Sequence, residues 1–143
     1  MDRSRAIKYL YKLISYKDYL EAEIIKKLKK KEVNPIIIEE LISEFKEYGY
    51  IDDNRYIETY IYFSINKLTG PYKIKNKLLF KGANIEIVEE ELEKQYPREK
   101  QKENLRKLIS KSSKDGDKLI SFCVRKGYSL NLVIEINSEL NSF

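Results

Sequence analysis

Positively and negatively charged side chains are segregated around Gly82. Four lysines precede this glycine and four glutamates follow it: Lys73, Lys75, Lys77 and Lys81, then Glu86, Glu89, Glu90 and Glu91. Lys73, Lys77 and Lys81 are spaced four apart, which places them on one side of a helix, with Lys75 on another side. Like charges at this spacing mildly oppose helix formation, so the pattern favours an external anion as their partner.

The same segregation recurs twice more along the chain, before and after residues 32–34 and residue 127. The candidate residues for binding a partner or nucleic acid are cations of the three basic segments: Lys26, Lys27, Lys30, Lys73, Lys77, Lys81, Lys118, Arg125 and Lys126. A second interpretation stays open, in which each segment is a solvated face that glutamates across the turn neutralise. Surface ion pairs stabilise by only about 0–1 kcal/mol each, so stability alone is a weak reason for so regular a pattern.

Most catalytic and metal-binding chemistry lacks its residues in this chain. There is no histidine and one cysteine, Cys123, so the usual zinc ligand sets, a catalytic imidazole and an intrachain disulfide are absent. Cys123 lies between Phe122 and Val124, which predicts a packed residue rather than a reactive thiol. Asp52 and Asp53 have no third acidic ligand at a matching spacing, and capping of a helix explains them. Most familiar enzyme chemistries are therefore unsupported by these residues, and we expect no catalytic residue, no metal and no cofactor.

The overall charge fits a partner with negative charge. The 143 residues carry a net charge of +5, and the isoelectric point is near 9.1. The opening MDRSRAIKYLYKLISYKDYL mixes apolar residues at helical spacing with charges, unlike a signal peptide, and no run approaches a membrane span. We expect a cytoplasmic protein with no membrane partner.

Helix-forming sequence dominates the chain. Only five glycines and three prolines interrupt long runs rich in Lys, Glu, Ile and Leu. Asn34 and Asn84 predict helix caps, and Pro71 suits the first turn of a helix. Gly82 supplies the residue for a corner after that helix. These signals predict an all-α fold.

The chain also repeats itself. A shift of 50 residues aligns Ile24 with Ile74 and Leu28 with Leu78, and a further shift of 45 aligns Gly82 with Gly127. We predict a single domain over residues 1–143 with three three-helix repeats, 1–51, 52–97 and 98–143, and about nine helices. Such units stack on their neighbours, so we expect an elongated, curved array, and a monomer.

Two segments resemble a known family. IDDNRYIETY at residues 51–60, followed by GPYKIKNKLLFKG at residues 70–82, is similar to the RecX family of bacterial recombination regulators. The structural positions of this pattern are Asp52, Asp53, Arg55, Tyr56, Gly70, Leu78 and Gly82, with Gly127 in the third repeat. Tyr56 and Ile57 stand where phenylalanine and alanine are usual, and Glu32 occupies the corner that holds glycine in the other repeats. A residue other than glycine there is expected to blunt the first bend.

The resemblance implies a modulator of the RecA recombinase that is not itself an enzyme. Such a protein binds the RecA filament on single-stranded DNA, lowers its ATP hydrolysis and strand exchange, and acts by groove occupancy, capping or disassembly. Single-stranded DNA is then a second candidate partner.

Two other functions remain open on the residues alone. The chain could bind DNA in its own right, although an acidic helix after each corner is poorly suited to the major groove. It could also be a generic helical scaffold for an acidic protein. Tyr56, Tyr60 and Tyr72 could stack on exposed bases. We expect Tyr56 and Tyr60 instead to fill helix interfaces, and Tyr72, at a helix start, to be the most exposed of the three.

Overall fold

The structure is a computed structural model that describes residues 1–142. Within this range there are helices and no strands, so the predicted all-α class is confirmed. The nine helices of the described chain are α1 (Arg3–Tyr16), α2 (Glu21–Lys30), α3 (Pro35–Glu47), α4 (Asp53–Asn66), α5 (Pro71–Phe80), α6 (Ile85–Gln95), α7 (Arg98–Lys111), α8 (Gly116–Arg125) and α9 (Leu130–Asn141).

The helix starts recur at the spacings of the sequence repeat. The second helices begin at Glu21, Pro71 and Gly116, in steps of 50 and 45 residues. The first helices and the third helices advance by the same two steps. The fold is thus a tandem array of three-helix repeats, while the repeat boundaries, the single domain and the elongated, curved shape stay predictions.

Short polar side chains begin the third helix of each repeat. The side chain of Asn34 accepts a hydrogen bond from the amide of Ile36, at 2.8 Å, and Asn84 caps α6 in the same way. Ser129 caps α9 through the amide of Leu132. The caps predicted at Asn34 and Asn84 are confirmed, because each side chain satisfies an amide that the helix leaves unpaired.

The corner before each third helix takes the left-handed backbone conformation. Gly82 and Gly127 have φ values of 97° and 106°. Glu32, at the matching position of the first repeat, has φ of 58°. The expectation of a blunter first bend is therefore wrong, because Glu32 adopts the strained conformation, which costs about 1–2 kcal/mol for a residue with a Cβ atom.

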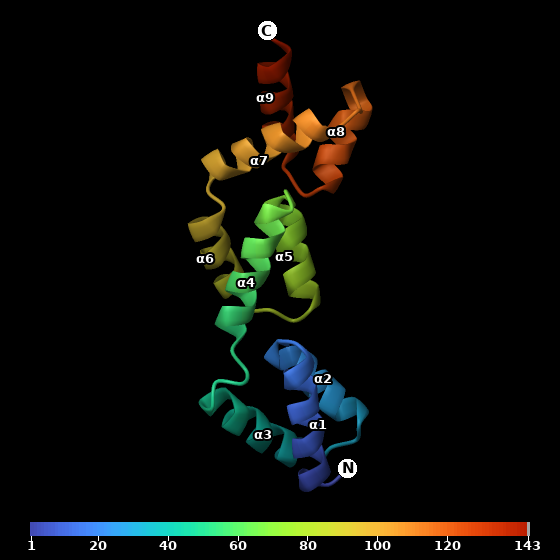
Figure 1. Ribbon diagram of the computed structural model, residues 1–143, viewed down its shortest axis with the longest axis vertical. Coiled ribbons are helices and arrows are strands. Elements are labelled where there is room, and N and C mark those ends of the chain that lie inside the picture. The colour runs from blue at the N-terminus through green and yellow to red at the C-terminus, as the bar shows by residue number, and fades with distance from the viewer. Residues whose placement is uncertain (143) are drawn as a thin grey trace. The chain divides into compact units, whose positions relative to one another are not determined.

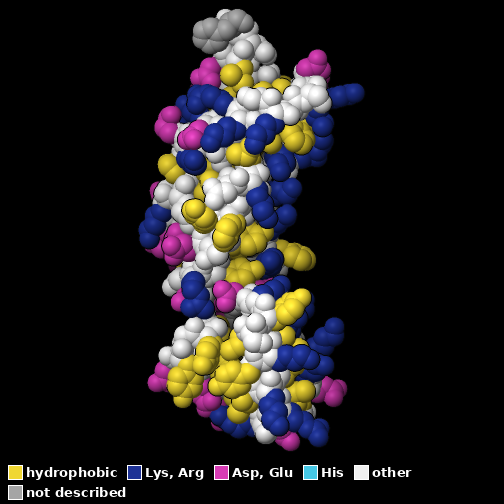
Figure 2. Space-filling model, in the orientation of Figure 1, with side chains coloured by type: hydrophobic (Ala, Val, Ile, Leu, Met, Phe, Trp, Pro, Cys, Tyr) yellow, Lys and Arg dark blue, Asp and Glu magenta, His cyan; other side chains and the backbone are white. Residues whose placement is uncertain are grey.

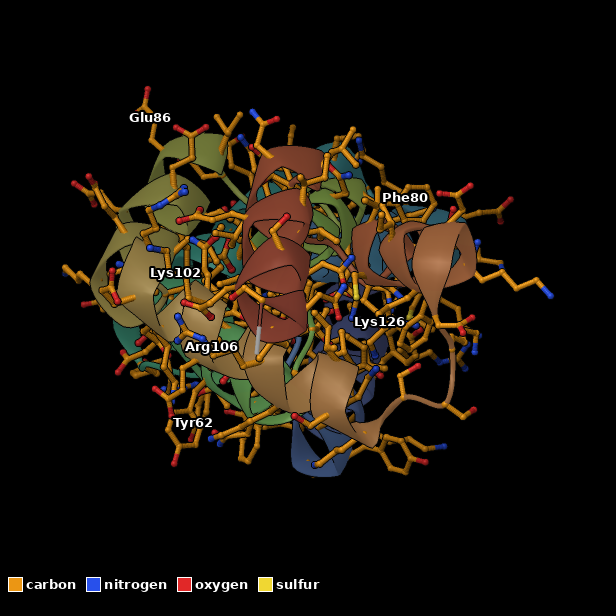
Figure 3. All side chains as sticks on the ribbon, turned by 90° about the horizontal axis from the view of Figure 1, so that it is seen from above. Tyr62, Phe80, Glu86, Lys102, Arg106 and Lys126 are labelled. Atoms are coloured by element: carbon orange, nitrogen blue, oxygen red, sulfur yellow. The ribbon has the colours of Figure 1, made fainter. Side chains whose placement is uncertain are left out.

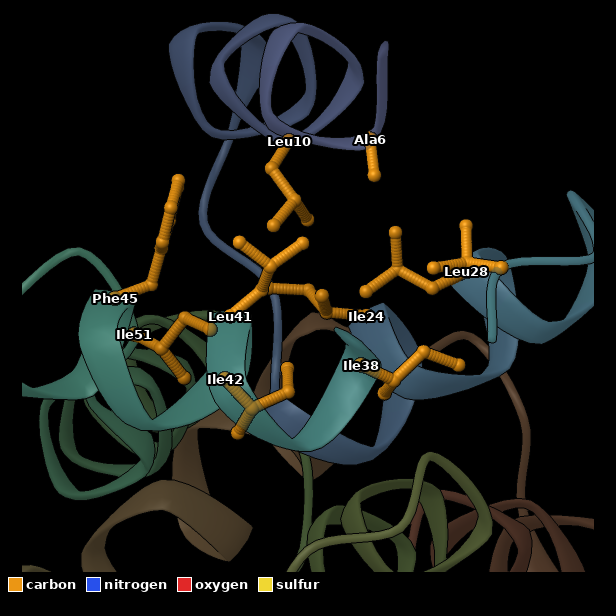
Figure 4. Close-up of a cluster of buried hydrophobic side chains, with 10 residues drawn as sticks. Ala6, Leu10, Ile24, Leu28, Ile38, Leu41, Ile42, Phe45 and Ile51 are labelled. Carbon is orange, nitrogen blue, oxygen red and sulfur yellow. The ribbon is translucent and has the colours of Figure 1, made fainter. Parts of the chain in front are cut away.

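The contacts between residues divide the chain into two compact units. Unit 1 comprises Met1–Ile57 with Lys81–Ala83, and unit 2 comprises Glu58–Phe80 with Asn84–Phe143. In unit 1, α1, α2 and α3 surround one apolar core, drawn in Figure 4 and located by the blue-to-teal helices of Figure 1. The core residues are Ala6, Leu10, Ile24, Leu28, Val33, Ile38, Leu41, Ile42, Phe45 and Ile51.

Unit 2 buries apolar side chains from each of its helices. The α5 helix packs on α6, and α7, α8 and α9 contact one another. The buried side chains include Ile61, Ile65, Ile74, Leu78, Val88, Leu105, Leu119, Cys123, Leu132, Val133 and Ile136. Cys123 is fully buried among them, and burial raises the pKa of its thiol. It is a packed residue, as predicted.

Candidate functional site

The nine predicted binding cations lie on the second helix of each repeat or at the corner that follows it. Lys26, Lys27 and Lys30 are on α2, and Lys73 and Lys77 are on α5. Because α5 ends at Phe80, Lys81 lies in the next turn rather than on the helix. On α8, Lys118 is in the first turn, Arg125 is the last helical residue and Lys126 is the C-cap.

Within unit 2, the start of α5 meets the end of α8. The amide of Gly70 donates to the carbonyl oxygen of Lys126, at 2.7 Å, and the amide of Tyr72 donates to that of Gly127, at 3.0 Å. A Cβ atom placed on Gly127 would lie 2.6 Å from the Cβ of Lys73. The structure therefore brings Lys73 against the corner that follows Lys126, whereas Lys118 is at the opposite end of α8.

Eight of the nine predicted cations form no ion pair with any residue in the range 1–142. They are Lys26, Lys27, Lys30, Lys73, Lys77, Lys118, Arg125 and Lys126. Lys27 lies over the ring of Tyr19, at 5.3 Å. The ninth, Lys81, donates a hydrogen bond to the Tyr56 hydroxyl, at 3.0 Å.

In repeats one and three, glutamates of the third helix pair with cations of the first helix instead. In repeat one, Arg3 on α1 contacts Glu40 at 2.9 Å and Glu44 at 2.7 Å, both on α3. In repeat three, Arg98 contacts Glu135 at 2.6 Å and Arg106 contacts Glu139 at 2.7 Å, from α7 to α9. Figure 3 labels Lys102 and Arg106, which lie between the ribbons of these two helices. Neutralisation across a corner, the second interpretation, applies to Lys75.

Lys75 pairs with Glu89 of α6 at 2.8 Å. It lies on a different side of α5 from Lys73 and Lys77, as predicted from its position in the helix. The side of α5 that carries Lys73 and Lys77 also carries two exposed aromatic residues. We define the α5 face as Tyr72, Lys73, Asn76, Lys77 and Phe80. Figure 2 shows Lys and Arg side chains along the edge formed by α5, with hydrophobic side chains between them.

The RecX-like pattern at residues 52–56 ties helix ends together. Asp52 caps α4 by accepting from the amide of Arg55, at 3.1 Å, as predicted. Asp53 instead accepts from the amide of Glu21 at the start of α2, at 2.8 Å. Burial raises the pKa of Asp53, and the hydrogen bond from Glu21 offsets part of that shift. Tyr56, where phenylalanine was expected, uses its hydroxyl to receive the Lys81 ammonium group.

The glycines and the leucine of the pattern have packing roles. Leu78 is fully buried. A Cβ atom on Gly70 would lie 2.2 Å from the carbonyl carbon of Gly127, and one on Gly82 would lie 2.5 Å from the Cβ of Ala22. The start of α2 in repeat one thus packs closely against the Gly82 corner of repeat two, and the start of α5 in repeat two packs against the Gly127 corner of repeat three.

A buried polar cluster in unit 2 was not predicted. The Tyr96 and Tyr128 hydroxyls lie 2.9 Å apart and contact the carbonyl oxygens of Thr69 and Leu68, each at 2.8 Å. Asn104, 2% exposed, donates to Tyr96 and to a carbonyl of α4. Burial raises the pKa of both tyrosines, and for Tyr128 the neighbouring Tyr96 adds to the shift. The one signal of this cluster in the sequence is the position of Tyr128, which directly follows the corner glycine Gly127.

Residues 1–142 contain neither a metal-binding cluster of side chains nor a membrane-spanning helix. No group of three or more Cys, Asp or Glu side chains there is arranged to hold a metal ion. No helix in that range is both long and apolar enough to cross a membrane.

Comparisons with known proteins identify the family. The family model described as "RecX, first three-helix domain" matches residues 3–45. The Regulatory protein RecX of Clostridium acetobutylicum is 34% identical over 152 residues, which cover 98% of this chain and 69% of the relative. The namesake from Bacillus mycoides is 37% identical over 139 residues, covering 90% of this chain and 50% of the relative.

Solved structures agree with the sequence relatives. The crystal structure of RecX from Lactobacillus salivarius matches 99% of this chain and 97% of its own, with a TM-score of 0.87 and 26% identity. A crystal structure of regulatory protein RecX matches 95% of this chain and 71% of its own, with a TM-score of 0.81 and 25% identity. The relatives carry the name of a regulatory protein rather than an enzyme. This chain belongs to the RecX family of regulatory proteins.

Proposed function

We propose that this protein regulates homologous recombination and DNA repair by binding the RecA filament on single-stranded DNA. It acts in the cytoplasm as a monomer without catalytic activity, and it lowers ATP hydrolysis and strand exchange by RecA. The family implies the RecA partner. The observation that carries the proposal is the set of second-helix cations that form no ion pair with the described residues.

These cations keep their charge available for an external partner. A single exposed ion pair contributes little, whereas several weak contacts made together by repeated units build affinity. Exposed lysines without an internal partner lose little internal stabilisation when they bind a phosphate or a carboxylate. The repeat of this arrangement in α2, α5 and α8 supports contact with a polymer rather than with a small ligand.

The test is the ATPase rate of bacterial RecA on single-stranded DNA with increasing amounts of this protein. Inhibition well below one molecule per RecA protomer indicates capping or disassembly, and inhibition only near saturation indicates groove occupancy. No inhibition at any ratio contradicts the proposal.

A charge-reversal variant tests the surface. Lys73→Glu with Lys77→Glu should weaken inhibition at least about tenfold, because two repulsive contacts replace two attractive ones. Lys81 is left unchanged because it contacts Tyr56. The matched control is Lys94→Glu with Lys111→Glu, which alters net charge equally at exposed positions of α6 and α7. Equal loss in both variants would mean that only net charge matters and would remove the α5 face from the mechanism.

A further inference from the structure

Phe80 is the most exposed large hydrophobic side chain within residues 1–142. It is 94% exposed and is the last residue of α5. The repeat shifts align it with Lys30 on α2 and Arg125 on α8, which are both exposed cations. At one position of the second helix, two repeats therefore present a positive charge and the middle repeat presents an aromatic ring.

The five residues of the α5 face share one side of the helix. At about 100° per residue, Tyr72, Asn76, Phe80, Lys73 and Lys77 fall within an arc of about 140°. The opposite side carries Ile74 and Leu78, both fully buried. Four of the five residues are exposed, with Tyr72 58% exposed, whereas Lys73 is half-buried beside the Gly127 corner.

The α5 face is positively charged and contains no acidic residue. Lys73 and Lys77 form no ion pair within residues 1–142, since the pairing lysine of this helix, Lys75, lies on another side. Phe80 (labelled in Figure 3) makes no ring contact with the described residues. By contrast, Phe122 on α8 is covered by the ammonium group of Lys114, at 4.6 Å.

Packing does not account for Phe80. A single exposed hydrophobic residue is ordinary on a protein surface. Here, however, two exposed aromatic rings lie at the two ends of a face whose middle holds two lysines. Tyr72 and Phe80 are separated by about 12 Å along the helix axis, from the rise of about 1.5 Å per residue.

We propose that the α5 face binds single-stranded DNA, with an unpaired base stacked on the ring of Phe80 and backbone phosphates on Lys73 and Lys77. Tyr72 provides a second stacking surface toward the start of the helix. Sequence-independent recognition of single strands combines these two elements, aromatic rings for bases and cations for the backbone. This inference rests on the proposed function, because the strand inside a RecA filament is the DNA that such a regulator meets.

The combination of rings and cations on the α5 face favours a nucleic acid over an acidic protein. A single strand carries flat apolar bases beside negative phosphates, and the α5 face carries aromatic rings beside ammonium groups. An acidic protein surface would match the lysines but would require a pocket for a ring that projects almost entirely into solvent. Binding to protein alone is an outcome that the experiment separates.

The Phe80→Trp variant provides a direct reporter of stacking on the α5 face. The chain has no tryptophan, so Phe80→Trp introduces a single indole at this site. Titration with an oligo(dT) of about 12 nucleotides should quench its emission saturably, because stacking on a base quenches indole fluorescence. An abasic oligonucleotide of the same length, which retains the phosphates, should quench it much less. No RecA is present, so the result does not depend on filament inhibition.

A second variant separates stacking from charge. Phe80→Leu should weaken oligo(dT) binding about tenfold, measured by fluorescence anisotropy, while affinity for the abasic strand should stay the same. Its salt dependence should not change. Lys73→Gln or Lys77→Gln should instead lower the slope of log K against log salt by about 0.7 each. The matched control is Phe63→Leu, which removes an exposed ring from α4, 57% exposed, outside the α5 face.

Three outcomes would overturn the inference. They are oligo(dT) affinity that Phe80→Leu leaves unchanged, equal quenching by the oligo(dT) and the abasic strand, and absence of wild-type binding to oligo(dT) at low salt. Quenching of the indole in the Phe80→Trp variant by RecA without DNA, together with no quenching by oligo(dT), would make the face a protein contact. Filament inhibition can persist in any of these cases, so failure of this inference is distinct from failure of the proposed function.

Discussion

The amide nitrogen of Gly70 lies 2.7 Å from the carbonyl oxygen of Lys126. Together with the bond from Tyr72 to Gly127, it joins the start of α5 to the end of α8. Helix ends normally leave first-turn amides and last-turn carbonyls without partners, and here the two sets satisfy each other. The positive end of one helix dipole also meets the negative end of the other.

Replacing Gly70 by alanine should destabilise unit 2. The new Cβ atom would lie 2.2 Å from the carbonyl carbon of Gly127, which is backbone and cannot turn away. We expect the free energy of unfolding, measured by urea denaturation, to fall by about 1–3 kcal/mol or more. Hydrogen exchange at the amide of Tyr72 should accelerate as its bond to Gly127 is lost.

The control for this substitution is Gly116→Ala. Gly116 has φ of 52°, and nothing lies within 4 Å of an added Cβ atom. It should therefore show only the backbone penalty of about 1 kcal/mol, with the Tyr72 amide still protected. Protection that persists in Gly70→Ala would show that the helix junction tolerates a side chain.

Replacing Glu32 by glycine should stabilise the protein. Glu32 holds φ of 58°, which glycine adopts without steric cost. The expected gain in the free energy of unfolding is about 1 kcal/mol. Glu32→Ala removes the same charge but retains the Cβ atom, so it should give no gain. An equal gain in both variants would assign the effect to charge.

Removing the Tyr128 hydroxyl should destabilise the core of unit 2. Tyr128 is 1% exposed, and its hydroxyl donates to the carbonyl oxygen of Leu68 at 2.8 Å. Tyr128→Phe leaves that acceptor without this partner, so we expect a loss of about 1–3 kcal/mol in urea denaturation. Tyr62→Phe is the control, because Tyr62 is 56% exposed, and should be neutral. A neutral Tyr128→Phe would mean that the cluster does not contribute to stability.

The same cluster should make the protein sensitive to alkali. Burial raises the pKa of Tyr128 above its usual value, so the unfolded chain loses this proton first. The free energy of unfolding that this raised pKa contributes is fully present below about pH 10. It is lost as pH rises above that value, by up to about 1.4 kcal/mol per pH unit. Tyr128→Phe should reduce this slope in urea denaturation between neutral and alkaline pH. Equal slopes for the two proteins would contradict the assignment.

Local signals predicted much of the fold. Asn34, Asn84 and Gly82 mark helix ends through their own backbone and side-chain preferences, so these ends could be predicted from the sequence. The strained backbone of Glu32 could not, because neighbours in the repeat impose it against the preference of the residue.

Contacts between residues far apart in the chain could not be predicted from the sequence. Tyr96 and Tyr128 are 32 positions apart, and neither residue type indicates that the two hydroxyls meet. The lysines of the second helices could be located, but the pairing of Arg3 with Glu40 and Glu44 required coordinates. Phe80 was likewise missed, since its exposure depends on which side of α5 the core covers.

The pairing of Arg3 with Glu40 and Glu44 also affects how a partner arrives. The electrostatic fields of opposite charges held a few ångströms apart cancel at a distance. The field beyond the surface of α2 is therefore set by Lys26, Lys27 and Lys30, which form no ion pair with residues 1–142. That field accelerates diffusional encounter with a polyanion before any contact forms. The association rate constant should therefore decline with ionic strength even where short-range contacts, and with them the residence time, are preserved.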